Sequence, residues 1–174
     1  MKKICRDRRA THYTIVESPV GPLLLAADSD AVTQLSFQAG PKAQPTEKDW
    51  IESSATARGG AAVLKEARKQ IVAYFSRELS RFDLPLAPKG TPFQERVWQE
   101  LQGIPYGETI SYGELARRIG NPKASRAVGA ANGQNPIAIV IPCHRVLGSN
   151  GTLTGFGGGL AIKETLLEHE RHYA

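Results

Sequence analysis

The sequence contains no long run of apolar residues. No stretch approaches the ~20 apolar residues that a membrane-spanning helix needs. No apolar segment follows the five basic residues among the first nine, so a secretion signal is not predicted. Cysteine is also scarce, because Cys5 and Cys143 are the only two. Two distant cysteines without a secretion signal indicate free thiols in a reducing compartment. We therefore expect a cytoplasmic protein with no membrane contact.

Metal ligands are too few to suggest a metal centre. A zinc ion is held by three or four Cys, His or carboxylate ligands. Cys5 and His12 supply only a fragment of such a set. We therefore expect no bound metal.

Charge and composition fit a folded protein with an acidic partner. Hydrophobic residues make up 41% of the 174 residues, an ordinary share for a globular protein. The net charge of +5 and the isoelectric point of about 9.4 favour a polyanion without requiring one. The length allows one domain or two small ones.

The N-terminal half has the pattern of a small sheet followed by a helix. Runs rich in apolar and β-branched residues at 13–17, 23–28 and 32–37 are separated by turn residues, which predicts an antiparallel meander. Residues 38–60 are polar and indicate a long loop. Apolar residues at helical spacing predict a helix over 63–77.

A domain boundary is predicted where structure-breaking residues gather. Pro85, Pro88 and Gly90 lie within six residues, and such stretches connect domains. We divide the chain into an N-terminal sheet domain at 1–88 and a C-terminal domain at 89–174. The expected fold class is α+β.

The C-terminal half begins with helix signals. Thr91, Pro92 and Gln94 form a capping box with proline at the first helical position, and the helix should run to about Gln102 with Trp98 in the core. Ser111–Glu114 forms a second capping box.

Two short helices are predicted after this second box. One should cover 112–119, and the next should start at Asn121-Pro122 and run to about Asn132. A pair joined by so short a turn containing Gly is typical of a helix-turn-helix, although an ordinary helical corner has the same pattern.

The second helix of this pair is rich in alanine and glycine and lacks most base-reading side chains. Arg126 is the one long charged side chain in its middle. A slim helix of this kind suits DNA binding without sequence reading. Lys123 and Ser125 would lie near phosphates, and Arg126 would enter the base stack, filling the space of an extruded base.

Cys143 is the candidate nucleophile. Lone buried cysteines usually act as small hydrophobes, but His144 and Arg145 beside it favour the thiolate. Asn135 and the glycine-rich segment 155–159 bracket it like pocket walls. Neighbours in an extended chain point to opposite sides, so a bridging water would link His144 to the sulfur unless the backbone turns.

The C-terminal segment 160–171 is predicted to form the last helix. This helix would place Glu170 where its carboxylate could reach a histidine.

These motifs together resemble the O6-alkylguanine-DNA alkyltransferase family, whose members repair O6-methylguanine by taking the alkyl group onto their own cysteine. The resemblance covers roughly residues 90–173. It rests on Thr91-Pro92-Phe93-Gln94, Ile104-Pro105-Tyr106-Gly107-Glu108-Thr109, Ser111-Tyr112-Gly113-Glu114-Leu115-Ala116, Arg126-Ala127-Val128-Gly129, Asn135-Pro136, Ile141-Pro142-Cys143-His144-Arg145-Val146 and Gly158-Gly159-Leu160. For the N-terminal half the resemblance implies a ribonuclease-H-like arrangement of a small sheet with helices.

The resemblance implies a role for each matching residue. Cys143 would accept the alkyl group, activated through a water by His144 with Glu170 behind it. Asn135 would brace the turn that holds the site. Arg126 would be the arginine finger that replaces the flipped base.

The resemblance also implies how the base is held. Tyr112 would donate a proton toward N3 of the leaving guanine, with Lys163 near it. The main-chain carbonyls of Cys143 and Val146 would accept from the exocyclic amine, and the Gly157 amide would face O6. The partner would be double-stranded DNA containing O6-alkylguanine, with O4-alkylthymine left open. A thioether has no easy exit, so the protein should act once, need no cofactor and work as a monomer.

Two positions depart from the family pattern. Many relatives carry tyrosine where this chain has Phe156, so that hydroxyl contact is absent. Some carry a second proline where it has Ala138. We expect Ala138 to give a roomier pocket that accepts bulkier O6 adducts.

Three other functions compete with repair. A helix-turn-helix regulator would need base-reading side chains on its second helix. A lesion-sensing relative that does not repair DNA would lack the cysteine, and a Cys–His hydrolase would turn over repeatedly without DNA. The motifs favour alkyl transfer over all three.

Overall fold

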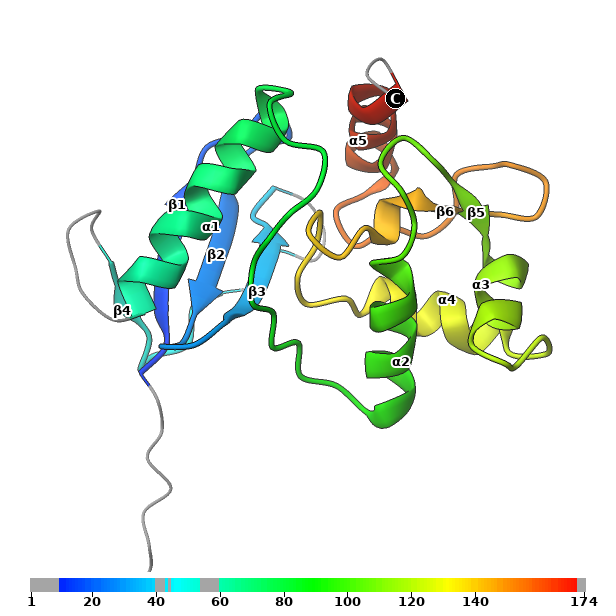
Figure 1. The fold of residues 1–174 in the computed structure, drawn as a ribbon, viewed down its shortest axis with the longest axis horizontal. Coiled ribbons are helices and arrows are strands. Elements are labelled where there is room, and N and C mark those ends of the chain that lie inside the picture. The colour runs from blue at the N-terminus through cyan, green and yellow to red at the C-terminus, as the bar shows by residue number, and fades with distance from the viewer. Residues whose placement is uncertain (1–9, 40–42, 44, 54–59, 172–174) are drawn as a thin grey trace, which may run out of the picture.

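The computed structural model describes residues 10–39, 43, 45–53 and 60–171. Cys5 lies outside the described residues. The chain forms an α+β fold with a small N-terminal sheet and a mainly helical C-terminal part (Figure 1). The elements in chain order are β1 (His12–Val16), β2 (Leu23–Ala27), β3 (Val32–Phe37), β4 (Ile51–Glu52), α1 (Gly60–Phe75), α2 (Pro92–Leu101), β5 (Ile110–Ser111), α3 (Tyr112–Arg118), α4 (Ser125–Gly133), a 3-10 turn (Cys143–Arg145), β6 (Val146–Leu147) and α5 (Leu160–Arg171).

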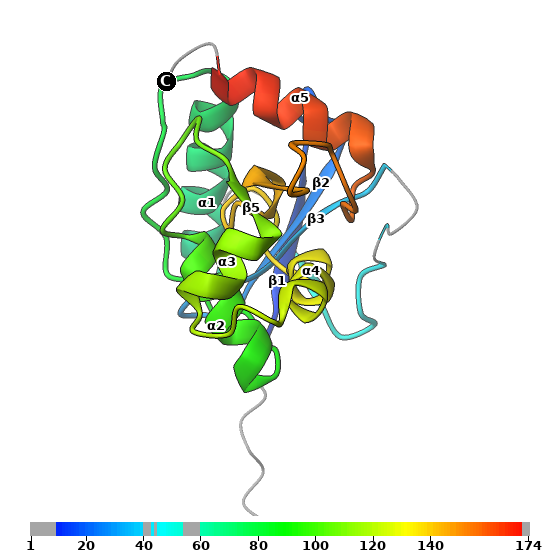
Figure 2. The same cartoon turned by 90° about the vertical axis from the view of Figure 1, so that its right-hand side faces the viewer.

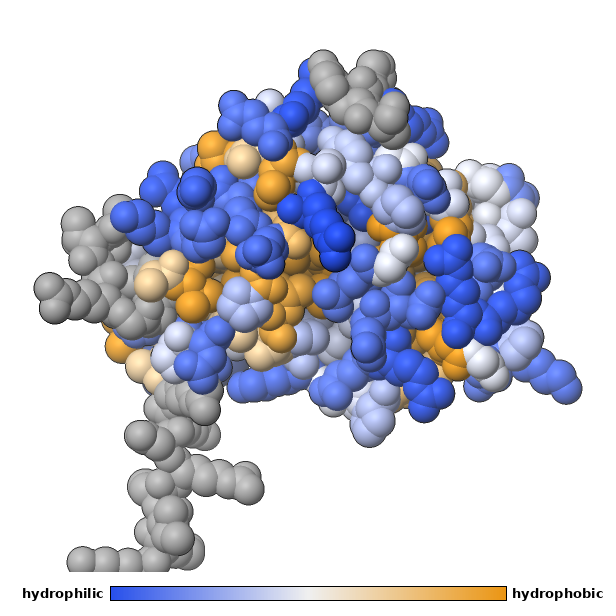
Figure 3. All heavy atoms as spheres, in the orientation of Figure 1, coloured by the Kyte–Doolittle hydropathy of each residue, from blue (hydrophilic) through white to orange (hydrophobic). Residues whose placement is uncertain are grey.

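The N-terminal sheet has the strand order β3-β2-β1-β4. The predicted meander is confirmed, because β1 pairs antiparallel with β2, and β2 with β3. The short strand β4, which pairs parallel with β1, was not predicted. α1 packs against the sheet through a buried face that includes Leu64, Ala67, Ile71 and Tyr74. In Figure 3 apolar side chains show mainly around α1, whereas hydrophilic ones cover much of the C-terminal part.

The helices α2 and α3 of the C-terminal part begin at the capping residues that the sequence predicted. The capping box of α2 is present, since the Thr91 hydroxyl accepts from Gln94 N at 3.3 Å and the Gln94 side chain accepts from Thr91 N at 2.7 Å. Ser111 caps α3 in the same way, but the Glu114 side chain binds Arg117 and not the cap. The capping-box prediction for α3 is therefore only half right.

The start of α4 differs from the prediction. The helix begins at Ser125, not at Asn121, because residues 121–124 form a separate turn closed by Ala124 N donating to Asn121 O at 3.0 Å. Ala124 is the N-cap and offers no side-chain hydrogen bond. α3 and α4 pack against each other and against α2 (Figure 2).

The apolar run before the cysteine is not a regular strand. It is held to the edge of β3 by two main-chain bonds, Leu35 N to Pro136 O at 2.9 Å and Ala138 N to Leu35 O at 2.8 Å. Ile139 then has φ of +70°, an unusual conformation for a β-branched residue. The path of the chain here is fixed by its bonds to β3 of the N-terminal sheet.

The cysteine turn is anchored on its other side by a second, two-stranded sheet. Its strands pair in parallel, with Ile110 opposite Val146 and Ser111 opposite Leu147. The turn therefore lies between the two parts of the fold. Within the described residues no helix is both long and apolar enough to cross a membrane. The domain boundary at 88 stays a prediction.

Candidate active site

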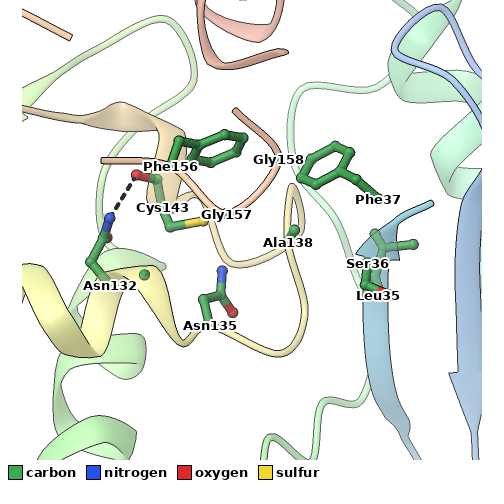
Figure 4. Close-up of a pocket in the computed structure, with 11 residues that line it drawn as sticks. Leu35, Ser36, Phe37, Asn132, Asn135, Ala138, Cys143, Phe156, Gly157 and Gly158 are labelled. Atoms are coloured by element: carbon green, nitrogen blue, oxygen red, sulfur yellow. Dashed lines mark hydrogen bonds between the residues drawn. The ribbon is translucent and has the colours of Figure 1, made fainter. Parts of the chain in front are cut away.

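Cys143 lies at the start of the 3-10 turn and borders a small cavity (Figure 4). Its side chain is free and only 4% exposed. The cavity holds about 60 Å³ and is lined by Leu35, Ser36, Phe37, Asn132, Gly133, Asn135, Ala138, Cys143, Phe156, Gly157 and Gly158. The thiol is therefore inside the protein but next to an open space.

The surroundings of Cys143 keep its sulfur protonated until a base acts on it. Burial raises the pKa of the Cys143 thiol, while a hydrogen bond from Asn135 and the charge of Lys163 oppose the rise. The sequence had pointed to Arg145 as the cation beside the thiol. The Arg145 guanidinium is instead committed elsewhere.

His144 is completely buried and is held by Glu170. Its Nε2 lies 2.8 Å from Glu170 Oε1, as the sequence predicted. Its Nδ1 is buried and has no hydrogen-bond partner among the described residues. Burial lowers the pKa of His144, and Glu170 only partly offsets this. The imidazole is therefore a neutral base at physiological pH.

Glu170 is the centre of a buried network. Its carboxylate accepts from Tyr74 OH at 2.8 Å, from Arg145 Nε at 2.8 Å and Nη2 at 2.9 Å, and from Gly107 N at 3.2 Å. Burial opposes ionisation, but the hydrogen bonds from His144 and Arg145 outweigh it, so the pKa of Glu170 is well below its usual range. The carboxylate is thus charged, and its charge is balanced by Arg145.

Asn135 braces the turn on which the cysteine lies. Its Nδ2 donates to Ile141 O at 2.8 Å, and its Oδ1 accepts from Ile137 N at 3.0 Å. Because one side chain closes both ends of the loop, the main chain before Cys143 is fixed.

Lys163, Tyr112 and Val146 form a second group beside the cysteine. Lys163 is fully buried and donates to Val146 O at 2.6 Å and to Thr154 O at 3.0 Å, and its Nζ lies 5.9 Å from the centre of the Tyr112 ring. The Tyr112 hydroxyl has long contacts of 3.5 Å, donating to the carbonyls of Thr154 and Gly155 and accepting from Asn132 Nδ2. Burial raises the pKa of Tyr112 and lowers that of Lys163. Tyr112 is therefore a neutral donor.

Comparison with known proteins decides the family. Residues 92–172 match the family described as 6-O-methylguanine DNA methyltransferase, DNA binding domain, and residues 11–88 match its ribonuclease-like domain. The chain belongs to the 6-O-methylguanine DNA methyltransferase family. The resemblance seen in the motifs is confirmed, and it extends over the N-terminal half.

Individual methyltransferases of this family are similar over almost the whole chain. The methylated-DNA–protein-cysteine methyltransferase of Methanosarcina acetivorans is 53% identical over 159 residues, which are 91% of this chain and 97% of that protein. The protein of the same name from Mycobacterium tuberculosis H37Rv is 48% identical over 94% of both chains. A crystal structure named Mycobacterium tuberculosis OGT in complex with DNA superposes with a TM-score of 0.83, at 47% identity and 94% coverage of each chain.

The predicted DNA-binding residues of this methyltransferase lie at the start of α4. Lys123 and Arg126 are exposed, and Ser125 is partly exposed. Val128, Ala131 and Asn132 are buried on the other side of the helix. The exposed side of α4 therefore carries the predicted DNA-binding residues, and its buried side carries Asn132, which contacts the Cys143 carbonyl.

Two residues of the methyltransferase site, Asn132 and Tyr74, were not predicted from the sequence, and Arg145 was expected beside the thiol and not at Glu170. Asn132 Nδ2 donates to the Cys143 carbonyl at 3.2 Å, while its Oδ1 is buried without a partner among the described residues. Arg145 and Tyr74 both bind Glu170. Tyr74 has the helical spacing of a core residue, so no local signal marks it. Within the described ranges no three His, Cys, Asp or Glu side chains are placed to hold a metal ion.

Proposed function

We propose that the protein repairs alkylated double-stranded DNA by moving the alkyl group of O6-alkylguanine to its own Cys143, once per molecule. The observation that carries this proposal is a free cysteine facing a small cavity, next to a buried neutral histidine that a charged carboxylate holds. Thiolate is the strong, soft nucleophile that an unactivated carbon–oxygen bond requires.

The first step is removal of the thiol proton. His144 Nδ1, which has no partner among the described residues, would accept this proton through a water. The imidazolium so formed would be stabilised by Glu170, 2.8 Å from Nε2. Glu170 is already ionised, so it supplies its charge without a further proton transfer.

In the transfer step a bond forms between Sγ and the alkyl carbon while the bond from that carbon to O6 breaks. The electron pair of the broken bond stays with the guanine, which then needs a proton. Tyr112 would donate it toward N3, and its raised pKa, which keeps it protonated, and its weakly bound hydroxyl support this role. The tyrosinate left behind then receives, through solvent, the proton that His144 took from the thiol, so both side chains return to their starting states.

Recognition of the base would use main-chain groups around the cavity. The carbonyls of Cys143 and Val146 would accept from the exocyclic amine, and the Gly157 amide would face O6. Both carbonyls already accept one hydrogen bond each, from Asn132 and Lys163, and a carbonyl oxygen can accept a second. Phe156 would pack on the base.

DNA would be bound by α4 and the residues just before it. Lys123 and Ser125 would contact phosphates, and Arg126 would fill the stack after the base is extruded. A cavity of about 60 Å³ takes a small alkyl group but not a purine, so we propose that the segment 154–159 moves aside to admit the base. We propose the monomer as the active form.

The decisive measurement is the intact mass of the protein after incubation with a duplex containing O6-methylguanine. A mass gain of one methyl group, stoichiometric and absent in Cys143→Ser, is expected. Binding without any gain would indicate a lesion-sensing protein. A sequence-specific footprint without a gain would indicate a regulator, and repeated turnover would indicate a hydrolase.

A further inference from the structure

One wall of the cavity beside Cys143 comes from the N-terminal sheet. Leu35, Ser36 and Phe37, at the end of β3, line the cavity on the side where Ala138 lies and face Cys143 across it (Figure 4). These residues were expected only to form a sheet. The cavity is therefore shared between the two parts of the chain.

The position of this wall is fixed relative to the cysteine. Leu35 exchanges two main-chain hydrogen bonds with the segment that leads to Cys143, accepting from Ala138 N at 2.8 Å and donating to Pro136 O at 2.9 Å. Phe37 follows two residues later on the same strand and points to the same side of the sheet as Leu35. Its ring is thus held by the strand and does not depend on a loop.

The ring of Phe37 closes the cavity together with Phe156. The side chain is only 6% exposed, and the two ring centres are 5.6 Å apart at an angle of 57°. The ring also lies against the glycine-rich segment, where a Cβ on Gly158 would come within 2.7 Å of Phe37 Cδ2. Space on this side of the cavity is limited by Phe37.

We propose that Phe37 is a specificity-determining residue that sets the largest O6 adduct the site accepts. This proposal rests on the proposed function. Ala138 and Phe37 both line the cavity, and the Phe37 ring takes up room that the small side chain of Ala138 leaves. A volume of about 60 Å³ suits a methyl group, and we expect the larger benzyl ring to collide with the Phe37 ring.

The test compares single-turnover transfer rates on two duplexes that differ only in the adduct, O6-methylguanine or O6-benzylguanine. Phe37→Leu and Phe37→Ala are measured beside the wild type. We expect the benzyl-to-methyl rate ratio to rise by about tenfold or more, the usual size of a steric effect in an apolar pocket. The methyl rate should stay within about threefold of the wild type.

Leu25→Ala is the matched control. Leu25 is buried in the neighbouring strand opposite Leu35 and does not itself line the cavity, so this variant loses core packing beside the wall while every side chain that lines the cavity keeps its identity. Its rate ratio should equal that of the wild type. Thermal unfolding of each variant shows which ones are folded. If Phe37→Ala does not fold, the comparison uses Phe37→Leu alone.

Two results would overturn the proposal. One is an unchanged ratio in a folded Phe37 variant, and the other is an equal change in Leu25→Ala. A wild type that transfers no methyl group would refute the proposed function itself, which is a different and recognisable outcome.

Discussion

At the residue scale, the chemistry of the site depends on which groups carry charge. Glu170 is ionised because its hydrogen bonds outweigh its burial, and His144 is neutral because its burial outweighs Glu170. A neutral base beside a fixed negative charge can accept a proton at little cost, since the product is an ion pair. The arrangement suits removal of a proton from a buried thiol whose pKa is raised.

The pH dependence of alkyl transfer should reveal the lowered pKa of His144. The imidazole must be neutral to act as base, and it stays neutral down to a pH below its ordinary pKa of about 6.5. Single-turnover methyl transfer should therefore be constant from neutral pH down through 6.5 and fall only at lower pH. Glu170→Gln should slow transfer by about 10²-fold at neutral pH, because the imidazolium loses its partner. A fall centred above pH 6.5 in the wild type would contradict this assignment.

At the element scale, local sequence signals predicted those elements whose ends depend on their own residues. The three long strands, α1, α2, α3 and α5 follow from apolar spacing, turns and caps. Local patterns did not reveal the short strand β4 or the path of residues 136–142, because both depend on partners far along the chain. The start of α4 was predicted too early, because residues 121–124 close a turn of their own.

Arg126 on α4 should matter for DNA and not for the reaction at the sulfur. We expect Arg126→Ala to slow methyl transfer from duplex DNA by about 10²-fold, because an unfilled base stack makes extrusion costly. The reaction with the free base O6-methylguanine, which needs no extrusion, should keep its wild-type rate. Arg117→Ala, a control on exposed α3, should weaken binding at most modestly, as lost phosphate contacts do. Equal losses with duplex and free base would show that Arg126 acts on the site itself.

At the scale of the whole molecule, the N-terminal part supports the site from two sides. β3 is bonded to the segment before the cysteine, and α1 reaches the last helix through Tyr74 and Glu170, which are 96 residues apart. The Tyr74 carbonyl is also 2.8 Å from His169 Nε2. The sequence predicted the cysteine and its histidine from their shared motif, and the carboxylate from its place on the last helix. It could not predict Tyr74 or Phe37, because each is an ordinary core residue until the two parts of the chain pack together.

Tyr74→Phe tests whether the N-terminal part tunes the base or only supports it. The variant removes one donor from Glu170, and a hydrogen bond to a buried charged group contributes about 1.5–3 kcal/mol to the free energy of unfolding. With one donor fewer the carboxylate becomes more basic and attracts the imidazolium more strongly, so the pKa of His144 should rise. The pH at which methyl transfer falls should therefore move upward from that of the wild type, as measured by single-turnover rates across pH.

Phe82→Leu is the control for Tyr74→Phe. The centre of the Phe82 ring lies 5.4 Å from that of the Tyr74 ring. This substitution removes packing volume beside Tyr74 but keeps the hydrogen bond from the Tyr74 hydroxyl to Glu170. Phe82→Leu should lower the free energy of unfolding, and the pH at which methyl transfer falls should stay that of the wild type. If both variants only reduce stability, the hydroxyl of Tyr74 is part of the core alone, and the N-terminal part has no influence on the base. A shift confined to Tyr74→Phe would instead make the proton-accepting strength of His144 a property of the whole fold.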